Sequence, residues 1–507
     1  MFWPPFLLLI AAMLYSFIDL TGYLALTTGI NAWILAKFSW LFSLSTFCLL
    51  ASLLVVFFSP LGKVRIGGVE AKPLLSKWRW FSITLCTTIA TGILFWSTAE
   101  PIYHLYAPPE SLDLAANSSE ARQFAMATMF MHWSFTPYAI YCVPSLVFAL
   151  CYYNLNKPFS IGSSLSLVFG KHAHGKGGQF VDAIALFALV AGMAASLGAG
   201  ILVLGGGIES VTGIANSKTV MAFVAAAIVT TFVVSAVSGL QNGIARLSNI
   251  NAQVFLFFFV FVLVFGPTNY ILSLGIDGAV GYGETFVARS TNQYTSGDDG
   301  WSNSWTVFYW ANWYAWAPVT ALFLGRISRG YTVKEFITIN LLLPASCAIL
   351  WISTFSGTTL HFDQLLDGAL RQNLLAQGPE SVIFALFEYL PLTTIIASLF
   401  IGITFISFVT AADSNTEAIS NLCSRDEPQP DNDKARIVLK YIWGGSIGIM
   451  AWTMVSFASI DGVKMMSNLG GLPAMLIIIV TNLSLFVLLK RSLQGHAFEP
   501  TKNSRHD

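Results

Sequence analysis

The densest group of chemically distinctive side chains is the aromatic run Trp305 to Pro318, which reads WTVFYWANWYAWAP. At 100° per residue, Trp305, Tyr309, Trp313 and Trp316 would share one face of a helix, within an arc of about 80°. Core packing and an interfacial aromatic belt are the alternatives, but a belt is confined to helix ends. Because this face runs over about three turns and into a proline, we expect it to contact a ligand.

A second aromatic group lies at residues 132–141, HWSFTPYAIY. Pro137 has no N–H, so it leaves a carbonyl one turn earlier without its usual donor and can bend a helix. Trp133, Tyr138 and Tyr141 would then line the bend. Two such helices facing each other would form an aromatic cage, which suits a quaternary ammonium held by cation–π attraction of about 0.5–2 kcal/mol per ring.

The composition indicates that a membrane positions these helices. Of the 507 residues, 55% are hydrophobic and only 10% are charged, against about 25% charged residues in soluble domains. The formal net charge of zero argues against a nucleic-acid partner, which would need a basic face. The six cysteines show no metal-ligand or redox spacing. The sequence therefore predicts an all-α integral membrane protein whose surroundings are the lipid bilayer.

About twelve apolar stretches are long enough to cross a bilayer, which requires about 20 residues. The fourth and tenth exceed one crossing, so we expect them to tilt or to extend beyond the membrane. The predicted spans cover 4–22, 39–61, 80–102, 123–153, 178–206, 219–238, 249–275, 304–325, 337–360, 388–420, 437–458 and 467–490.

The Lys and Arg residues are distributed unequally between the breaks. Most of the 26 fall in one alternating set of breaks, and the positive-inside rule places that set, with both termini, in the cytoplasm. The outside segments 276–303 and 362–384 are long enough to hold short surface helices. The other set of breaks holds only Lys37, Arg122, Lys218, Arg289, Arg371 and Lys464.

The run Trp305 to Trp316, continued by RISRG at 326–330, closely resembles the signature of the betaine/carnitine/choline transporter (BCCT) family. The resemblance extends over roughly residues 5–485, and further segments occur in the family's order. They are HW at 132–133 with Pro137 and Tyr141, ASLG at 195–198, GLQNG at 239–243 and ADS at 412–414.

This resemblance implies a LeuT-like fold in which spans 3–7 and 8–12 form two inverted five-helix repeats around a site at mid-membrane. It implies one transporter domain over 1–490, with two leading helices (1–79), a first repeat (80–275) and a second repeat (304–490). Residues 491–507 would form a short cytoplasmic tail. A homotrimer in the bacterial inner (plasma) membrane is also implied.

The family's aromatic box would fall on four residues, with Trp316 next along the path to the cytoplasm. The box position at Tyr138 is usually Trp in the family, and Asn312 stands where Trp is common. The hydroxyl and the amide favour a ligand that is smaller or more polar than glycine betaine. The four box residues are Trp133, Tyr138, Tyr141 and Trp313.

The coupling ion is expected to be sodium or a proton. Sodium-dependent relatives have a Gly-rich unwound stretch in the third span, whereas TIATG at 88–92 has one glycine, Gly92. Of a hydroxyl pair on the tenth span only Thr410 is kept, as a candidate sodium ligand beside Ala411. Sodium-independent carnitine/γ-butyrobetaine antiporters place an arginine where this chain has Asn251. We therefore expect cation-coupled symport of glycine betaine, choline, carnitine or a similar methylated solute, and an antiporter is the alternative.

Ionisable residues inside a membrane are functional candidates. Glu100, near the outer end of span three, would be part of an outer gate or a proton site; the alternative is a helix-end carboxylate in water. Asp413, on the cytoplasmic half of span ten, would hold neighbouring backbone or hydroxyl groups in place. With Gly92 and Asn251, these residues are the candidates for gating or coupling.

The sequence shows no convergent nucleophile and base, no metal motif such as HExxH and no phosphate-binding loop. We therefore expect neither an enzyme nor a cofactor other than the coupling ion. A membrane solute sensor or receptor is the alternative from another class. The chain ends are short and mixed in charge, which favours transport without osmosensing by a terminal extension.

Overall fold

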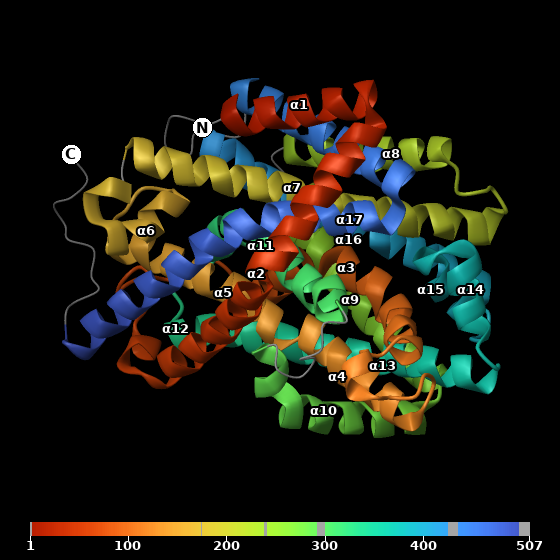
Figure 1. Cartoon of the computed structure of the whole chain (residues 1–507). Coiled ribbons are helices and arrows are strands. Elements are labelled where there is room, and N and C mark those ends of the chain that lie inside the picture. Colours follow the sequence, from red (N-terminus) through yellow and green to blue (C-terminus); the bar gives the residue numbers. More distant parts are fainter. Residues whose placement is uncertain (1–2, 174, 238–240, 292–299, 424–433, 496–507) are drawn as a thin grey trace.

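The computed structural model describes residues 3–173, 175–237, 241–291, 300–423 and 434–495 (Figure 1). Within these ranges the regular structure is helical, apart from an isolated antiparallel bridge between Arg65 and Thr332. The α-helices are α1 Trp3–Ile18, α2 Leu20–Phe58, α3 Lys77–Tyr106, α4 Ser119–Trp133, α5 Phe135–Ala149, α6 Ile161–Phe169, α7 Lys176–Thr212, α8 Lys218–Val237, α9 Gln241–Phe265, α10 Thr268–Ser290, α11 Phe308–Arg326, α12 Val333–Ile337, α13 Leu343–Leu365, α14 Ala369–Gln377, α15 Val382–Phe387, α16 Thr393–Cys423 and α17 Lys434–Leu493.

Many of these helices are long and apolar enough to cross a membrane. In the described part of the chain eight qualify, or up to nine if the bent helix α3 is counted as one span. This confirms an all-α integral membrane protein. The count of twelve spans and the LeuT-like arrangement stay predictions, and residues 496–507 of the predicted tail lie outside the described residues.

The first two predicted spans have different limits in the structure. Helix α1 ends at Ile18, and the side chain of Asp19 accepts a hydrogen bond from the backbone N–H of Gly22 to begin α2. Helix α2 has 39 residues, or about 58 Å at 1.5 Å per residue, which is about twice the thickness of a bilayer core. A sequence window cannot distinguish one long helix from a span with an apolar extension.

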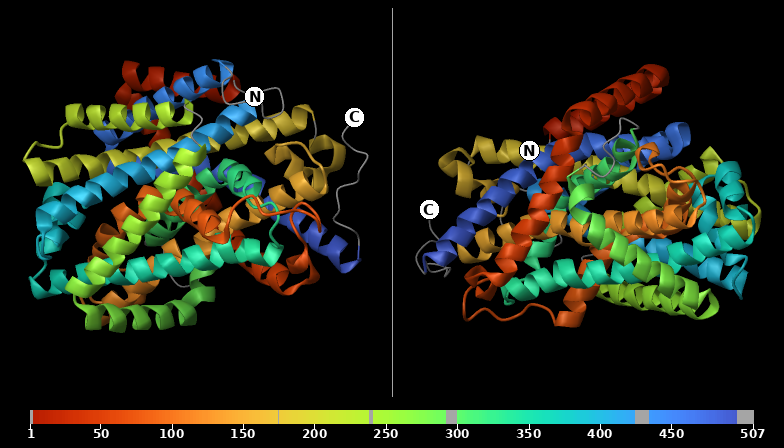
Figure 2. Two further views of the ribbon diagram at one scale, coloured as in Figure 1. Left: turned by 180° about the vertical axis from the view of Figure 1, so that it is seen from behind. Right: turned by 60° about the horizontal axis from the view of Figure 1, so that its bottom comes forward.

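The seventh predicted span, 249–275, extends beyond the end of the helix in the structure. Helix α9 ends at Phe265, and the Gly266–Pro267 pair separates it from α10, because proline cannot donate the next helical hydrogen bond. Helix α14 forms within 362–384, one of the two segments that were expected to hold short helices. Helix α10 has 23 residues and begins within the predicted seventh span before it enters the other segment, 276–303. In Figures 1 and 2, α10 lies along one edge of the bundle and α1 along the opposite edge.

The last two predicted spans, 437–458 and 467–490, both fall on α17. This element covers 60 residues, and a break at Ser459, whose φ of 48° lies in the left-handed region, divides it into two helices. The break occurs one residue after the predicted end of the first of the two spans. Figure 1 shows one part of α17 running from the lower left into the middle of the molecule.

Helix α11 lies inside the bundle, where it packs against α5, α7 and α17. Glycine permits the closest of these approaches. A Cβ built on Gly471 of α17 would lie 2.5 Å from the Cα of Ala311 on α11, and such a contact between backbones cannot relax. Small residues thus bring these helices together, as is usual in membranes.

Two irregular segments enter this core. The chain breaks at Ser134, between α4 and α5, where φ is −113° and ψ is −124°. This confirms the bend expected near Pro137, although it occurs three residues earlier. A π-helical turn, η5 (Asn303–Val307), leads into α11. Such π-turns are frequent at functional sites, and both irregular segments border the aromatic residues singled out above.

Candidate substrate-binding site

The four predicted box rings meet at one place. The centroid of the Trp313 ring lies 5.8 Å from that of Trp133, 5.6 Å from that of Tyr138 and 5.2 Å from that of Tyr141. The other three rings flank the Ser134 break, so this bend aims both of its sides at α11. All four side chains are buried. The indole Nε1 of Trp313 is also buried and has no hydrogen-bond partner among the described residues.

Gly92 provides the space for one wall of this box. A Cβ at Gly92 would lie 2.9 Å from Cη2 of Trp133. The two halves of α3, Lys77–Thr88 and Gly92–Tyr106, meet at an angle of 54°. The single glycine therefore lies at a bend and against a box ring, although its part in gating stays a prediction.

The remaining two predicted substrate residues lie apart from the four rings. Trp316 donates from Nε1 to Oγ of Ser196 on α7 at 3.0 Å. Oδ1 of Asn312 lies 3.1 Å from Oγ of Ser467 on α17. The aromatic face of α11 is thus shared between neighbours, and hydrogen bonding directs Trp316 and Asn312 towards α7 and α17.

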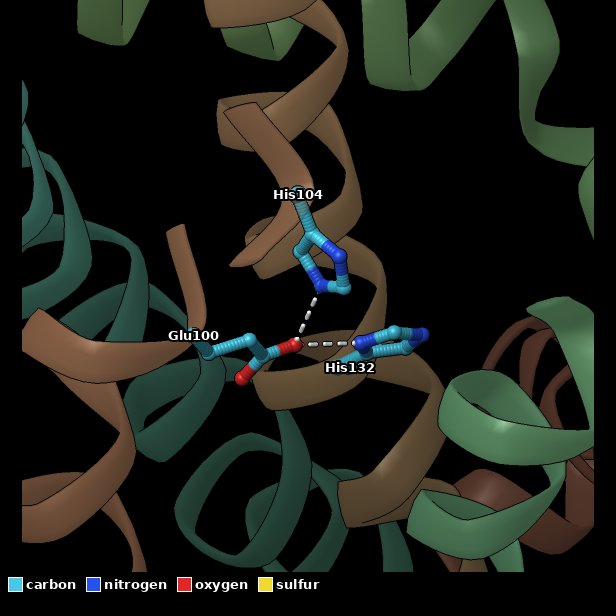
Figure 3. Close-up of side chains that lie close together, drawn as sticks. All are labelled: Glu100, His104 and His132. Carbon is cyan, nitrogen blue, oxygen red and sulfur yellow. Dashed lines mark hydrogen bonds and ion pairs between the residues drawn. The ribbon is translucent and has the colours of Figure 1, made fainter. Parts of the chain in front are cut away.

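Glu100 is the centre of a buried polar cluster (Figure 3). Its Oε1 lies 3.0 Å from Nε2 of His104 and 2.6 Å from Nδ1 of His132. Its Oε2 accepts hydrogen bonds from Nε1 of Trp133 at 2.8 Å and from the hydroxyl of Tyr309 at 2.5 Å. The Glu100 side chain is 0% exposed. The interpretation of Glu100 as a helix-end carboxylate in water is therefore wrong.

This cluster, which we call the Glu100 cluster (Glu100, His104, His132, Trp133 and Tyr309), shares Trp133 with the aromatic box. The ring of Tyr309 lies 5.2 Å from that of Trp133. The sequence did not mark His104 as a site residue, and it did not connect His132 or Tyr309 with Glu100. One signal was present, because Glu100 and His104 are four residues apart and so share a helix face.

The ligand atoms of Glu100, His104 and His132 lie within 4.8 Å of one another. One carboxylate and two imidazoles form a donor set that can hold a transition metal. In this structure the same atoms are engaged with one another, so they are already satisfied as a hydrogen-bonded group.

The coupling candidates link α16 to its neighbours. Asn251 donates from Nδ2 to Oγ of Ser407 at 2.9 Å, which joins α9 to α16. Asp413 accepts a hydrogen bond from the Ser235 hydroxyl at 2.5 Å, so it holds a hydroxyl group as expected. The Thr410 hydroxyl lies 3.0 Å from backbone oxygens of its own helix. Its role as a sodium ligand stays a prediction.

Membrane-length helices packed around buried aromatic and ionisable side chains define an integral membrane protein. The sequence model of "BCCT, betaine/carnitine/choline family transporter" matches residues 1–494. The chain belongs to this family, which confirms the resemblance noted above. It is accordingly a transporter and not an enzyme.

Curated relatives match nearly the whole chain. An ectoine/hydroxyectoine transporter of Virgibacillus pantothenticus is 30% identical over 90% of this chain and 89% of its own length. The glycine betaine transporter OpuD of Bacillus subtilis is 30% identical over 97% of this chain and 94% of its own. An osmo-independent choline transporter of Acinetobacter baylyi is 29% identical over 91% and 88%.

Outside this site, the side chain of Glu380 is expected to make the stability of the protein depend on pH. It lies in the 3-10 turn η7 (Pro379–Ser381), outside the membrane-spanning helices, and is 9% exposed. A Cβ on Gly206 of α7 would lie 3.1 Å from its Cγ. Burial, together with the negative charge of Glu209, raises the pKa of Glu380 from 4.5 to about 7.

Because the folded state binds this proton more tightly, its stabilising effect is present below pH 4.5 and is lost as the pH rises through 7. Glu380→Gln should therefore stabilise the protein at pH 8, by on the order of 3 kcal/mol, and have little effect at pH 4.5. Thermal unfolding in detergent between these pH values measures the difference. Glu388→Gln, at an exposed position, is the control, and equal pH profiles for Glu380→Gln and wild type would contradict the prediction.

Proposed function

We propose that the protein is a secondary active transporter that takes up a quaternary-ammonium compound or related methylated zwitterion by cation-coupled symport. The observation that carries this proposal is the contact of Trp313 with Trp133, Tyr138 and Tyr141. Ring faces suit a methylated ammonium, which has no N–H to donate and is attracted by the π electrons. The unpartnered indole N–H of Trp313 suits a carboxylate or hydroxyl on the same ligand.

The box rings touch one another directly, so a ligand enters only when they separate. The irregular segments around the box suit such a movement: the Ser134 break, the bend of α3 at Gly92 and the π-turn η5. Alternating access would then open the box first to one side of the membrane and then to the other.

The substrate class follows from the box and is consistent with the relatives, whose names specify ectoine, glycine betaine and choline. We propose glycine betaine, choline, carnitine or a similar compatible solute. Asn251 stands where the sodium-independent antiporters have arginine, and it is hydrogen-bonded to Ser407. The chain thus lacks their fixed charge, which favours coupling to sodium or a proton over exchange.

The proposed architecture completes the bundle with twelve spans, in which residues 80–275 and 304–490 form inverted repeats. We also propose both termini in the cytoplasm, the bacterial inner membrane as the location and a homotrimer as the assembly. The outside segments that contain α10 and α14 would supply surface for contacts between subunits.

Uptake by proteoliposomes tests the function. Betaine, choline, carnitine, γ-butyrobetaine and trimethylamine N-oxide are offered separately under an imposed sodium gradient, a proton gradient or no gradient. We expect at least one of them to accumulate only when a cation gradient is imposed. Accumulation only with a second substrate inside the vesicles would assign an exchanger, and no uptake of any of the five would contradict the proposed function.

A further inference from the structure

We propose that the carboxylate of Glu100 is a fixed negative charge that strengthens binding of the substrate's ammonium in the aromatic box. It would act through Trp133 and Tyr309. Glu100 is then a positioning and specificity-determining residue. This inference rests on the proposed function, because it assigns a role at the same site.

The connection between charge and box is direct. Both donors to Oε2 of Glu100 are polar atoms of aromatic side chains, the indole N–H of Trp133 and the hydroxyl of Tyr309. A hydrogen bond donated to an anion shifts electron density into the donor's ring. Cation–π attraction is electrostatic, so a ring with more electron density holds a cation more strongly. In a buried site of low dielectric constant this effect is larger than in water.

Among the residues that the structure describes, only the two imidazoles form ion pairs with the Glu100 carboxylate. The nearby guanidinium of Arg289 lies 4.8 Å from the ring centre of Phe124 and donates to Thr128. The ammonium of Lys464 lies 4.2 Å from the ring centre of Trp305. Neither forms an ion pair with Glu100 in the part of the chain that the structure describes. A buried charge favours a counter-charge, and a substrate ammonium in the box would supply one.

The test is equilibrium binding of choline and glycine betaine to the purified full chain at pH 8, with a metal chelator present. The first variant, Glu100→Gln, removes the charge and keeps the shape of the side chain. The second, Tyr309→Phe, keeps the ring and removes the hydrogen bond from its hydroxyl to Glu100. The matched control is Asp182→Asn, because Asp182 is also buried but accepts its hydrogen bonds from residues 160–162 at the start of α6.

We expect wild type and Asp182→Asn to bind choline with equal affinity. Glu100→Gln should bind about tenfold more weakly than wild type, and Tyr309→Phe should be intermediate. If Glu100→Gln elutes as a monodisperse protein and keeps the wild-type affinity, the inference is overturned. Failure of the wild type to bind either ligand would instead overturn the proposed function.

Discussion

Trp313→Leu should reduce uptake by at least 100-fold, equivalent to about 2.7 kcal/mol. Trp313 is the ring that contacts each of the other three box rings. Leucine fills much of the volume but offers neither a π face nor an N–H. The ligand would lose its strongest cation–π partner, and the aromatic pairs, worth about 0.5–1.5 kcal/mol each, would also be lost. Initial uptake rates in proteoliposomes measure the effect.

The matched control for this change is Trp33→Leu. Trp33 lies on α2 and its side chain is 53% exposed, so the substitution makes the same chemical change away from the box. Both variants should insert and purify as monodisperse proteins, and Trp33→Leu should transport like wild type. Normal uptake by correctly inserted Trp313→Leu would refute the site assignment.

Glu100→Ala should destabilise the protein by about 2–6 kcal/mol, which is the largest effect on stability that we expect. Alanine leaves the indole N–H of Trp133 and the hydroxyl of Tyr309 buried without their acceptor. Each such unsatisfied donor costs about 1–3 kcal/mol. His104 and His132 lose the same acceptor, and a cavity remains where the carboxylate was. The measurement is the midpoint of thermal unfolding in detergent.

Glu100→Gln distinguishes the lost hydrogen bonds from the lost charge. The amide oxygen can still accept from Trp133 and Tyr309, and a change of tautomer lets His132 accept from the amide nitrogen. We therefore expect its stability to lie much closer to wild type than that of Glu100→Ala. An unfolding midpoint for Glu100→Ala equal to that of wild type would show that the cluster does not stabilise the folded protein.

The grouping of the box rings could be predicted in part from local patterns, and the family resemblance selected Trp313 from the aromatic face of its helix. Pro137 predicted the bend that turns Trp133 and Tyr138 inwards, and helical periodicity placed Trp313 on one face of its helix. Periodicity could not predict which neighbour each residue of α11 meets. Trp316 bonds to Ser196 on α7 and Asn312 faces Ser467 on α17, and these contacts depend on how the helices pack.

The Glu100 cluster was harder to predict for the same reason. Glu100 precedes a proline near the end of a predicted span, where water and burial are both compatible with the sequence. Its burial depends on α4 and α11, which contribute His132 and Tyr309 from distant parts of the chain. Only the spacing of Glu100 and His104 was a local signal, and one pair on a helix face does not identify a cluster.

Helix existence was predictable from apolar length, whereas helix limits were predictable only in part. Hydropathy predicted spans at 437–458 and 467–490, and the break in α17 at Ser459 falls where the first of them was expected to end. Helix α9 ends at Phe265 because Gly266 and Pro267 follow it. The predicted span ran past this pair because the apolar residues continue beyond it. Local backbone chemistry thus corrects limits that hydropathy alone extends too far.

The central claim is that the box recognises the positive charge of a methylated ammonium. The most direct measurement compares the binding of choline with that of 3,3-dimethylbutan-1-ol, in which carbon replaces the charged nitrogen, and of glycine betaine with 3,3-dimethylbutanoate. The purified wild-type protein should bind the better ammonium of the two at least tenfold more tightly than its carbon analogue, since cation–π attraction contributes about 0.5–2 kcal/mol per ring. Equal affinities within both pairs would show that the box recognises shape and apolar surface, and would contradict the account.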